Sequence, residues 1–391
     1  MDSMGSISEQ HTKKILSMLH PLTEEDTVLR ASYQGYSLRI YSTSDFQRQS
    51  SQCMKQMGIY TFIQKINRTK SKIDQICLKN IVKEVRTILD DLFCSHCLTL
   101  QQYKQMQFNR ADVKLNSLHF VLAANENNIV RPIMTCKDGP TMGIARYLRD
   151  LLWSIFHQLT GCLTLSNGAN LVQAFELYSE KGYLQSTNLF TSFNINEFCN
   201  KFSHQVMIKA LEHFLRTYGT EDNMHGLTID TIIKLVSLVL QNQFFVYQDK
   251  LYEQTMGSAS GLPLTIPLAC IYIFYCQPTL LTALIVQQEN QNELFGIFQD
   301  DLFPTWNKSE DELRVLLDMP MMVDEQHIQI TTLSIGTTFP FGDVVVYHAH
   351  GILHSKIYHD PRTDQYQLRN KCKHGTSQSA RLLHARLIHA V

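Results

Sequence analysis

The sequence FGIFQDDLF, residues 295–303, decides the fold of this chain. An apolar run stops at two adjacent carboxylates, Asp300 and Asp301, and then resumes. This pattern is typical of a β-hairpin with one buried strand into Phe298, an acidic turn, and a second strand that continues through Trp306. Two negative charges between apolar strands stay ionised only when a cation compensates them, and Mg2+ prefers carboxylate oxygens. We therefore expect a cation site here, with a plain acidic turn as the alternative.

Length and composition are those of an ordinary globular protein. The chain has 391 residues, of which 44% are hydrophobic and 18% are charged. This length suits one large core or roughly two to three lobes. The 35 Lys and Arg residues nearly balance the 36 Asp and Glu residues, so bulk charge does not favour nucleic acid. A nucleic-acid partner would need a local basic groove.

The cysteines and the N-terminus bear on the compartment. Ten cysteines are scattered without a framework spacing, which is typical of a reducing environment. Residues 1–10 are polar and lack the apolar core of a signal peptide. We expect an intracellular location, cytoplasmic or nuclear.

One uncharged stretch has the length of a membrane span. Residues 254–288 carry no Asp, Glu, Lys or Arg, and 264–286 is long enough to cross a bilayer. Pro267 and Pro278 interrupt it, however, and basic residues do not flank it. We expect a buried core helix here and no membrane partner.

Several smaller features carry weaker signals. Residues 1–53 are polar and are expected to form an extension that packs poorly. The basic run 65–72 either meets phosphates or is the solvated start of a helix over 76–93. The sequence Cys-Ser-His-Cys at 94–97 is like half of a zinc knuckle, but no second pair stands at a workable spacing. We expect no zinc there, and none at the C-terminal histidines.

The rest of the chain alternates strands, helices and loops. The expected strands are 128–134, 189–195, 244–247, 251–254, 328–334 and 341–347. The expected helices are 145–159, 203–215, one capped by Thr228, one opened by the glycine loop 257–263, and one after the capping box 309–312. This order predicts an α+β fold with an antiparallel sheet backed by helices. A polymerase palm needs such a sheet, because carboxylates on two neighbouring strands hold the two metal ions of an in-line phosphoryl transfer.

A series of motifs stands in a fixed order along the chain. They are Arg131-Pro132-Ile133 followed by Gly139-Pro140-Thr141, Gln254 and Gly257 with Gly261-Leu262-Pro263-Leu264-Thr265, Phe298-Gln299-Asp300-Asp301, Phe339-Pro340-Phe341-Gly342-Asp343, and 351–358 with Pro361-Arg362-Thr363. From about Leu98 to the C-terminus, this order resembles that of a reverse transcriptase, most closely those of Penelope-like retroelements.

The resemblance implies a right-hand polymerase fold with fingers, palm and thumb. The implied activity is that of an RNA-directed DNA polymerase, a nucleotidyltransferase that uses Mg2+ or Mn2+, an RNA template, a DNA primer and dNTPs. Asp300 and Asp301 would hold metal, and Arg131 would steady the triphosphate. The other positions implied to face nucleotide or template are Gln254, Gly257, Gly261, Pro263 and Cys199. Cys199 stands where the family has an aromatic residue.

One departure from the family decides the expected activity. Asn194 stands where the first palm strand of the family presents a metal-binding Asp, and no Asp occurs between Asp150 and Asp222. An Asn is a neutral ligand with a single carbonyl oxygen. Glu197 does not replace the lost carboxylate, because a residue three positions along a strand points to the opposite face. We expect Asn194 to lower the rate of polymerisation on the order of a thousandfold relative to a site with Asp.

Two further departures concern the fingers and the thumb. Residues 122–127 lack a phosphate-facing Lys that the family has, and the sequence reaches only what resembles the first thumb helix. The expected regions are a polar extension (1–53), a fingers-like region (54–185), a palm (186–347), and post-palm strands with the start of a truncated thumb (348–391). We expect a catalytically impaired protein of retroelement origin. The alternatives are a non-catalytic module that binds nucleic acid or protein, and a retroelement fragment without a selected role.

Overall fold

The computed structural model describes most of the chain and divides it into two compact units. The described residues are 27–31, 38–66, 72–109, 112–122, 130–165, 167–195, 199–200, 202–298, 301–318, 321–323, 326–328, 330–341 and 344–357. The first unit is Met1–Met57, Phe120–Pro132 and His359–Val391, and the second is Gly58–His119 and Ile133–Tyr358. The four regions expected from the motif order are not tested by this division and stay predictions.

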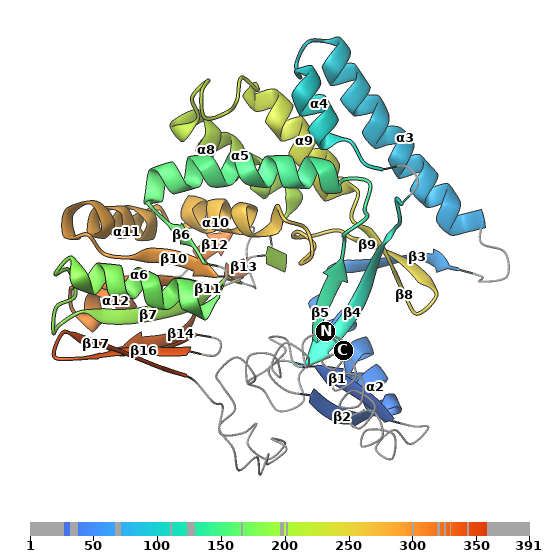
Figure 1. The fold of residues 1–391 in the computed structure, drawn as a ribbon. Helices are drawn as coiled ribbons and strands as arrows, with labels where there is room; N and C mark the ends of the chain where they lie inside the picture. The colour runs from blue at the N-terminus through green and yellow to red at the C-terminus, as the bar shows by residue number, and fades with distance from the viewer. Residues whose placement is uncertain are drawn as a thin grey trace, which may run out of the picture. The chain divides into compact units, whose positions relative to one another are not determined.

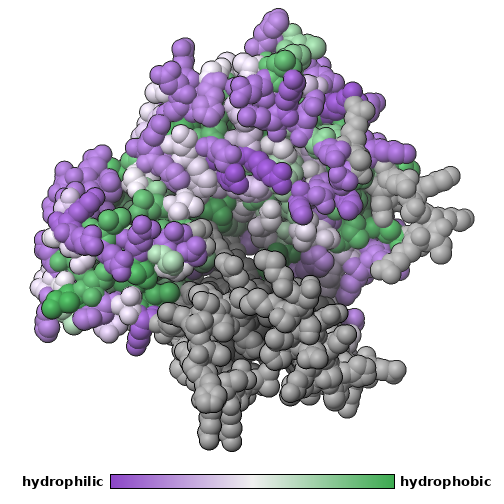
Figure 2. Space-filling model, in the orientation of Figure 1, coloured by the Kyte–Doolittle hydropathy of each residue, from purple (hydrophilic) through white to green (hydrophobic). Residues whose placement is uncertain are grey.

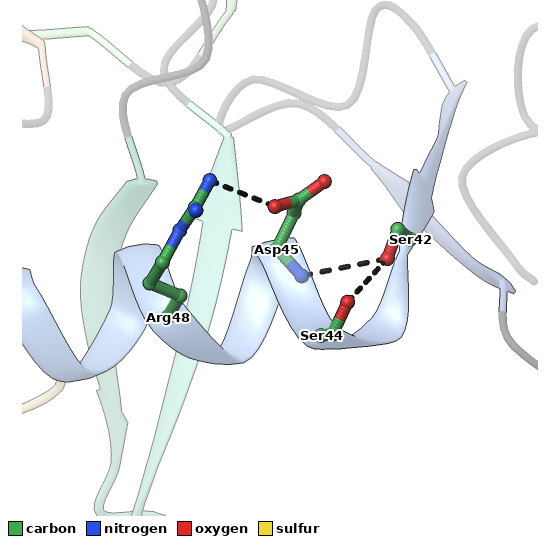
Figure 3. Close-up of polar contacts among 4 residues, drawn as sticks. All are labelled: Ser42, Ser44, Asp45 and Arg48. Atoms are coloured by element: carbon green, nitrogen blue, oxygen red, sulfur yellow. Dashed lines mark hydrogen bonds and ion pairs between the residues drawn. The ribbon is translucent and has the colours of Figure 1, made fainter.

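In the first unit, a strand pair leads directly into a helix. Strand β1 (Thr27–Ala31) pairs antiparallel with β2 (Leu38–Ser42), and α2 (Thr43–Met57) follows. The hydroxyl of Ser42 accepts from the backbone N–H of Asp45 at 3.5 Å and lies 2.7 Å from the Ser44 hydroxyl (Figure 3). Arg48 donates to the Asp45 carboxylate at 2.8 Å. These polar side chains stabilise the N-terminal turn of the helix.

The expectation that residues 1–53 pack poorly is wrong for α2. Phe46 and Ser50 on this helix are buried. The low apolar content of this segment suggested a loose extension, but one aromatic side chain on a helix with a capped first turn is enough to anchor it. A compositional average does not show that arrangement.

One five-stranded sheet has the strand order β3-β9-β8-β4-β5, and all of it lies in the second unit except residues 120–122 and 130–132, which the division assigns to the first. Its strands are β3 (Tyr60–Lys65), β4 (Asn116–Leu122), β5 (Val130–Thr135), β8 (Phe244–Tyr247) and β9 (Lys250–Gln254). Strands β8 and β9 form the predicted hairpin, with Gln248 and Asp249 in the turn at φ of 46° and 57°. Two successive left-handed residues suit the right-handed twist of a hairpin.

A second sheet, of order β14-β7-β11-β10-β6, contains the acidic hairpin. Its strands are β6 (Leu163–Thr164), β7 (Leu189–Asn194), β10 (Phe295–Phe298), β11 (Asp301–Trp306) and β14 (Thr331–Gly336). All of its ladders are antiparallel except the one between β10 and β6. The predicted hairpin through Phe298 and Trp306 is therefore confirmed, while its turn at 299–300 lies outside the described residues.

Helices form a layer over this sheet, and Figure 1 shows α5 lying across α10 with β10 and β11 beyond it. The helices preceding the acidic hairpin are α3 (Lys72–Cys94), α4 (Leu100–Met106), α5 (Met142–Thr160), α6 (Gly168–Glu180), α8 (His204–Tyr218), α9 (Ile229–Gln241), α10 (Thr265–Cys276) and α11 (Pro278–Gln291). Thr228 caps α9 as predicted, because its side chain accepts from the N–H of Thr231. Helix α10 packs against α5, α8 and α11.

The expected single core helix over 264–286 is wrong, because the structure divides it into α10 and α11. The two helices are bent by 105° at a break that contains only Gln277. A residue before proline is driven out of the helical region, and Gln277 accordingly has φ −130° and ψ 70°. Along the described chain, no helix is long and apolar enough to cross a membrane alone; this bent pair passes that test only jointly, by length and composition.

A helix, a strand pair and a three-stranded sheet follow the acidic hairpin. Helix α12 (Glu310–Leu317) begins after Ser309, whose hydroxyl accepts from the Glu312 N–H. The strand pair β12 (Met321–Val323) and β13 (Gln326–Ile328) comes next. After β14, the three strands β15 (Thr338–Phe341), β16 (Val344–Ala349) and β17 (Ile352–Ile357) form an antiparallel sheet in that order.

The observed architecture is mixed helix and sheet with mainly antiparallel ladders, as the order of motifs predicted. In Figure 2, hydrophilic residues dominate the part of this face over α3, α5 and α9. Hydrophobic residues gather at the lower left, where Figure 1 places α6, α12 and the strands beside them. Leu177, Val315 and Ile352, on α6, α12 and β17, are exposed.

Candidate active site

The strand that ends at Asn194 lies beside the strand that begins at Asp301. The two residues are register partners in the β7–β11 ladder, and both are half-buried. The side-chain Nδ2 of Asn194 donates to Oδ1 of Asp301 at 2.6 Å. The predicted juxtaposition of the strand that ends at Asn194 and the strand that follows the acidic turn is therefore confirmed.

Packing fixes both strand ends. Strand β7 is central in its sheet, with β11 on one side and β14 on the other, and its residues 190–193 are buried. In β10, a Cβ on Gly296 would lie 2.0 Å from the ring of Phe303, so the hairpin closes only with glycine there. Asn194 comes at the end of this buried stretch, where a polar side chain can reach its neighbour.

The first residue of a third strand, β14, lies beside Asn194. Thr331 of β14 is the register partner of Asn194 on the side away from β11. The register shifts between Thr332 and Ser334, and the Ser334 hydroxyl lies 2.8 Å from that of Ser192. A bulge beside a strand terminus re-aims the side chains around it. The structure thus brings Asp301, Asn194 and Thr331 to neighbouring backbone positions.

The described residues of this site do not fit two metal ions. Asp301 is the one carboxylate among the three strand-end residues, and the Asn194 amide donates to one of its oxygens. A cation at that oxygen would compete with the N–H donor for the same lone pairs. Within the part of the chain that the structure describes, no group of three or more His, Cys, Asp or Glu could hold a metal. Asp300 and Glu197 lie outside the described residues.

The glycine loop that follows β9 is held tightly at its first glycine. Gln254 is buried, and its side-chain amide donates to the carbonyl of Met256 at 2.9 Å. Gly257 has φ of 65°, and its N–H donates to the carbonyl of Phe202 at 2.8 Å. A Cβ at Gly257 would lie 2.4 Å from the carbonyl oxygen of Cys199, so both conformation and contact require glycine.

The second part of the loop is in close backbone contact with β5. A Cβ at Gly261 would meet the carbonyl oxygen of Met134 at 1.7 Å. Beside it, the Met134 N–H donates to the Ser260 hydroxyl at 3.0 Å. Half-buried Pro263 follows just before α10. The glycine positions singled out in the sequence are therefore places where the backbone closely approaches the backbone of another segment.

Two residues that the sequence did not single out fasten this loop. The side chain of Gln243 accepts from the N–H of Ala259 at 2.6 Å and donates to the carbonyl of Gly257 at 3.0 Å. Nε2 of His204 donates to the same carbonyl at 3.0 Å. Burial lowers the pKa of His204, and the bond to Gly257 opposes that shift. The only sequence signal was a polar residue between an apolar helix and an apolar strand.

Two predicted binding residues occupy different settings. Cys199 is buried, and its backbone carbonyl accepts from the N–H of Ser258 at 2.7 Å, so it helps to hold the loop. Arg131 lies on β5 within the first unit. The nucleotide-facing roles expected for both residues stay predictions.

A buried carboxylate braces the base of the acidic hairpin. Glu293 is 4% exposed and accepts from Tyr178 at 2.8 Å, from Asn188 at 2.9 Å, and from the hydroxyl of Thr305 on β11. Burial raises the pKa of Glu293, and these three donors oppose the shift. Burial, followed by the nearby charge of Glu293, also raises the pKa of Tyr178. No local pattern in the sequence indicates this network, because its members are far apart along the chain.

The same network is connected to the three-stranded sheet β15–β16–β17 through a histidine. Nε2 of His348 donates to the backbone carbonyl of Asn188 at 2.7 Å, and its Nδ1 accepts from the N–H of Gly351 at 3.3 Å. Both ring nitrogens are therefore engaged, Nε2 as a donor and Nδ1 as an acceptor. Strand β16 ends at Ala349, and His350 lies in the turn with φ of 52°, so His348 and His350 do not lie on the same strand.

No family model and no curated protein matches the chain. Among solved structures, it is similar to apo telomerase from Candida tropicalis truncated from its C-terminal domain, at 8% identity and a TM-score of 0.47, over 84% of this chain and 63% of that one. Telomerase from Candida albicans, in complex with a fragment of telomeric RNA, gives 10% identity and a TM-score of 0.49, over 84% and 53%. An RNA polymerase complex inside a dsRNA virus gives 10% and 0.40, over 83% and 28%. The chain spans less than two thirds of the length of each.

Proposed function

We propose that this chain has a reverse-transcriptase-like polymerase fold and that its two-metal site is impaired by Asn194. The observation that carries the proposal is the register pairing of Asn194 with Asp301 and the hydrogen bond between their side chains. A polymerase palm requires carboxylates at adjacent ends of neighbouring strands. These two positions are adjacent strand ends, and one of them carries an amide.

The amide changes the chemistry in two ways. It removes one negative charge from the site, and it supplies an N–H donor that satisfies an oxygen of Asp301. The hydrogen bond stabilises the ionised carboxylate and occupies one of its oxygens, which then has less lone-pair capacity for a cation. Loss of one group from a preorganised site costs on the order of three decades in rate. We infer that this chain does not extend a primer at a measurable rate.

The remaining assignments follow from the resemblance and belong to the same proposal. Asp300 and Asp301 are the metal-binding pair of the ancestral site, and Arg131 is the triphosphate-binding residue. The loop from Gln254 to Pro263 orients template and nucleotide, and its close backbone contacts support a fixed loop conformation. The origin is a Penelope-like retroelement, the ancestral ligands are an RNA template, a DNA primer and dNTPs, and the location is intracellular.

Primer extension tests the proposal directly. The full chain and its Asn194→Asp variant are compared on an RNA template with a DNA primer, dNTPs and either Mg2+ or Mn2+. We expect no product from the natural chain and product from Asn194→Asp. The Asn194→Asp, Asp301→Ala double variant is the control and should lose that product. Robust synthesis by the natural chain that disappears on Asp301→Ala would contradict the impairment.

A second candidate function is a non-catalytic module that binds nucleic acid or protein. The Asn194–Asp301 hydrogen bond favours it, because the site is satisfied without a cation. Binding of a primer–template duplex, measured by fluorescence anisotropy in EDTA and in Mg2+, separates the two. A non-catalytic binder should have the same affinity in both buffers, whereas cation-dependent affinity would favour a residual polymerase site.

A further inference from the structure

The three-stranded sheet β15–β16–β17 has one face in a hydrophobic core and a second face on which most of the described side chains are exposed, with Val345 buried among them. Phe339 and Phe341 of β15 and Val346 of β16 are buried in a core with Phe175 and Phe190. On β15 the alternate residues Thr338 and Pro340 are exposed. Because strand side chains alternate between faces, the second face carries a different set of residues from the core face. This face lies beyond the Asn194–Asp301 site.

The second face carries an aromatic and basic cluster formed by Tyr347, His354 and Lys356. Tyr347 and His354 are register partners across β16 and β17, and their rings are stacked at 5.1 Å with an interplanar angle of 24°. Lys356 lies two residues along β17, with its ammonium 5.7 Å from the centroid of the Tyr347 ring. His354 and Lys356 are exposed, and Tyr347 is half-buried.

The described part of this sheet carries basic side chains and no carboxylate. In the described residues of its three strands and the β16–β17 turn, Lys356 and three histidines are the titratable side chains besides Tyr347, and no Asp or Glu is present. The chain as a whole is nearly neutral, and the exposed basic groups among the described residues of this sheet are Lys356, His350 and His354. A local basic surface is what an anionic polymer needs in order to bind a protein without bulk positive charge.

We propose that this face, which we call the Tyr347 face, binds single-stranded nucleic acid. The exposed His354 ring, backed by Tyr347, offers a planar surface on which an unpaired base can stack. Lys356 lies beside it, where it can meet a phosphate of the same strand. Aromatic side chains displayed on a flat antiparallel sheet next to basic residues are a general solution to single-strand binding. A duplex is disfavoured, because its bases are already stacked on one another.

Charge complementarity favours nucleic acid over a protein partner on the part of the face formed by Tyr347, His354 and Lys356; exposed Ile352 lies two residues from His354 on the same strand. The three side chains present a cation and polar rings. Interfaces with proteins use desolvated apolar anchors at their centre. The inference rests on the proposed function only in taking nucleic acid as the ligand class of the fold, and it makes no use of the cation site.

Fluorescence anisotropy with a labelled 12-nucleotide RNA, and separately with the DNA of the same sequence, tests the inference on the full chain in EDTA. We expect His354→Ala to weaken binding about tenfold, as the loss of one stacked base does. Lys356→Gln should weaken it several-fold and reduce the slope of log K against log salt by about 0.7, because one phosphate contact is lost. Lys356→Arg should retain binding.

The chain offers matched controls. His213 and Tyr275 form a second His–Tyr ring pair, with centroids 5.6 Å apart on α8 and α10, and Lys234 is exposed on α9. His213→Ala and Lys234→Gln remove the same groups elsewhere and should bind as the natural chain does. Thermal melts of all variants establish that each is folded. Equal losses in the control variants, or none in the Tyr347-face variants, would overturn the inference.

The outcomes separate this inference from the proposed function. Failure of the natural chain to bind either oligonucleotide would overturn the inference. Binding that is lost in His354→Ala supports the inference even if Asn194→Asp restores no synthesis. A third outcome is that Asn194→Asp synthesises product and that adding His354→Ala changes neither this synthesis nor oligonucleotide binding. That outcome would support the proposed function and overturn the inference.

Discussion

Asn194 donates its side-chain N–H to the carboxylate of Asp301 across the β7–β11 ladder, at 2.6 Å. In a two-metal polymerase site, two carboxylates at such positions repel one another until a cation binds. An amide in place of one of them turns that repulsion into a charge-assisted hydrogen bond. The stability of the natural chain should therefore differ from that of its carboxylate variant in a measurable way.

Asn194→Asp should make the stability of the chain depend on divalent cations. Two carboxylates at paired positions raise the pKa of one of them, which destabilises the folded chain at neutral pH by about 1.4 kcal/mol for each tenfold change in its ionisation constant. We expect a lower melting temperature for Asn194→Asp in EDTA, and recovery on addition of Mn2+ or Mg2+. Differential scanning fluorimetry measures both.

The natural chain and Asn194→Ala serve as controls for that shift. Neither creates a second carboxylate, so neither should be stabilised by the divalent cation. A melting temperature of Asn194→Asp that is the same in EDTA and in Mn2+ would show that the two side chains do not form a shared cation site.

Glu293→Gln should remove a pH dependence of stability. Burial raises the pKa of Glu293 in the folded chain above its ordinary value of 4.5. The folded state therefore favours the protonated form, and its advantage is complete below pH 4.5. That advantage is lost as pH rises through the folded pKa, because the unfolded chain ionises more readily. Urea unfolding from pH 4 to pH 8 measures this decline, and Glu293→Gln should lack it.

The control for this experiment is Glu289→Gln, which changes an exposed glutamate on α11 and should leave the pH profile as it is in the natural chain. Glu293→Ala is expected to destabilise at every pH, because the side chains of Tyr178 and Asn188 lose their buried partner. A profile of Glu293→Gln that parallels the natural chain would place the titrating group elsewhere.

Gly261→Ala should destabilise the loop for a steric reason. An added Cβ would lie 1.7 Å from the carbonyl oxygen of Met134, which is backbone and has no room to give. We expect a loss of about 1 to 3 kcal/mol in the free energy of unfolding, as in other overpacked sites. Gly182→Ala is the comparison, because Gly182 has φ of 77° but open space around its Cβ position. Gly261→Ala should cost more; a smaller loss than in Gly182→Ala would mean that loop and strand separate easily.

Gln243→Ala should loosen the same loop without touching its sequence. The buried N–H of Ala259 loses its acceptor, and the carbonyl of Gly257 loses one of its donors. An unsatisfied buried group costs about 1 to 3 kcal/mol. Hydrogen exchange should therefore show reduced protection of the Ala259 amide in Gln243→Ala. Gln241→Ala, an exposed change at the end of α9, is the control. Equal protection of Ala259 in both variants would assign the fixing of the loop to other contacts.

Local patterns in the sequence were enough to predict much of the secondary structure. The hairpin through Phe298 and Trp306 follows from apolar runs on either side of an acidic turn, and the start of α9 follows from Thr228 as a cap. The dipeptide Gln277-Pro278 also indicates the break between α10 and α11. The expected single helix over 264–286 is nevertheless wrong, because continuous hydrophobicity alone does not distinguish one buried helix from two.

The sequence by itself determined which residues end the strands, that an amide stands at one of those ends, and where glycine is required. Only the tertiary structure decided that Asn194 and Asp301 are register partners, because strand pairing joins segments more than 100 residues apart in sequence. Only it brought Glu293 to Tyr178 and Gln243 to Ala259, since a buried polar group must find its partner wherever the packed chain places one. It alone also left most of the Tyr347 face exposed, because burial depends on which elements pack on a sheet and not on the strand sequence.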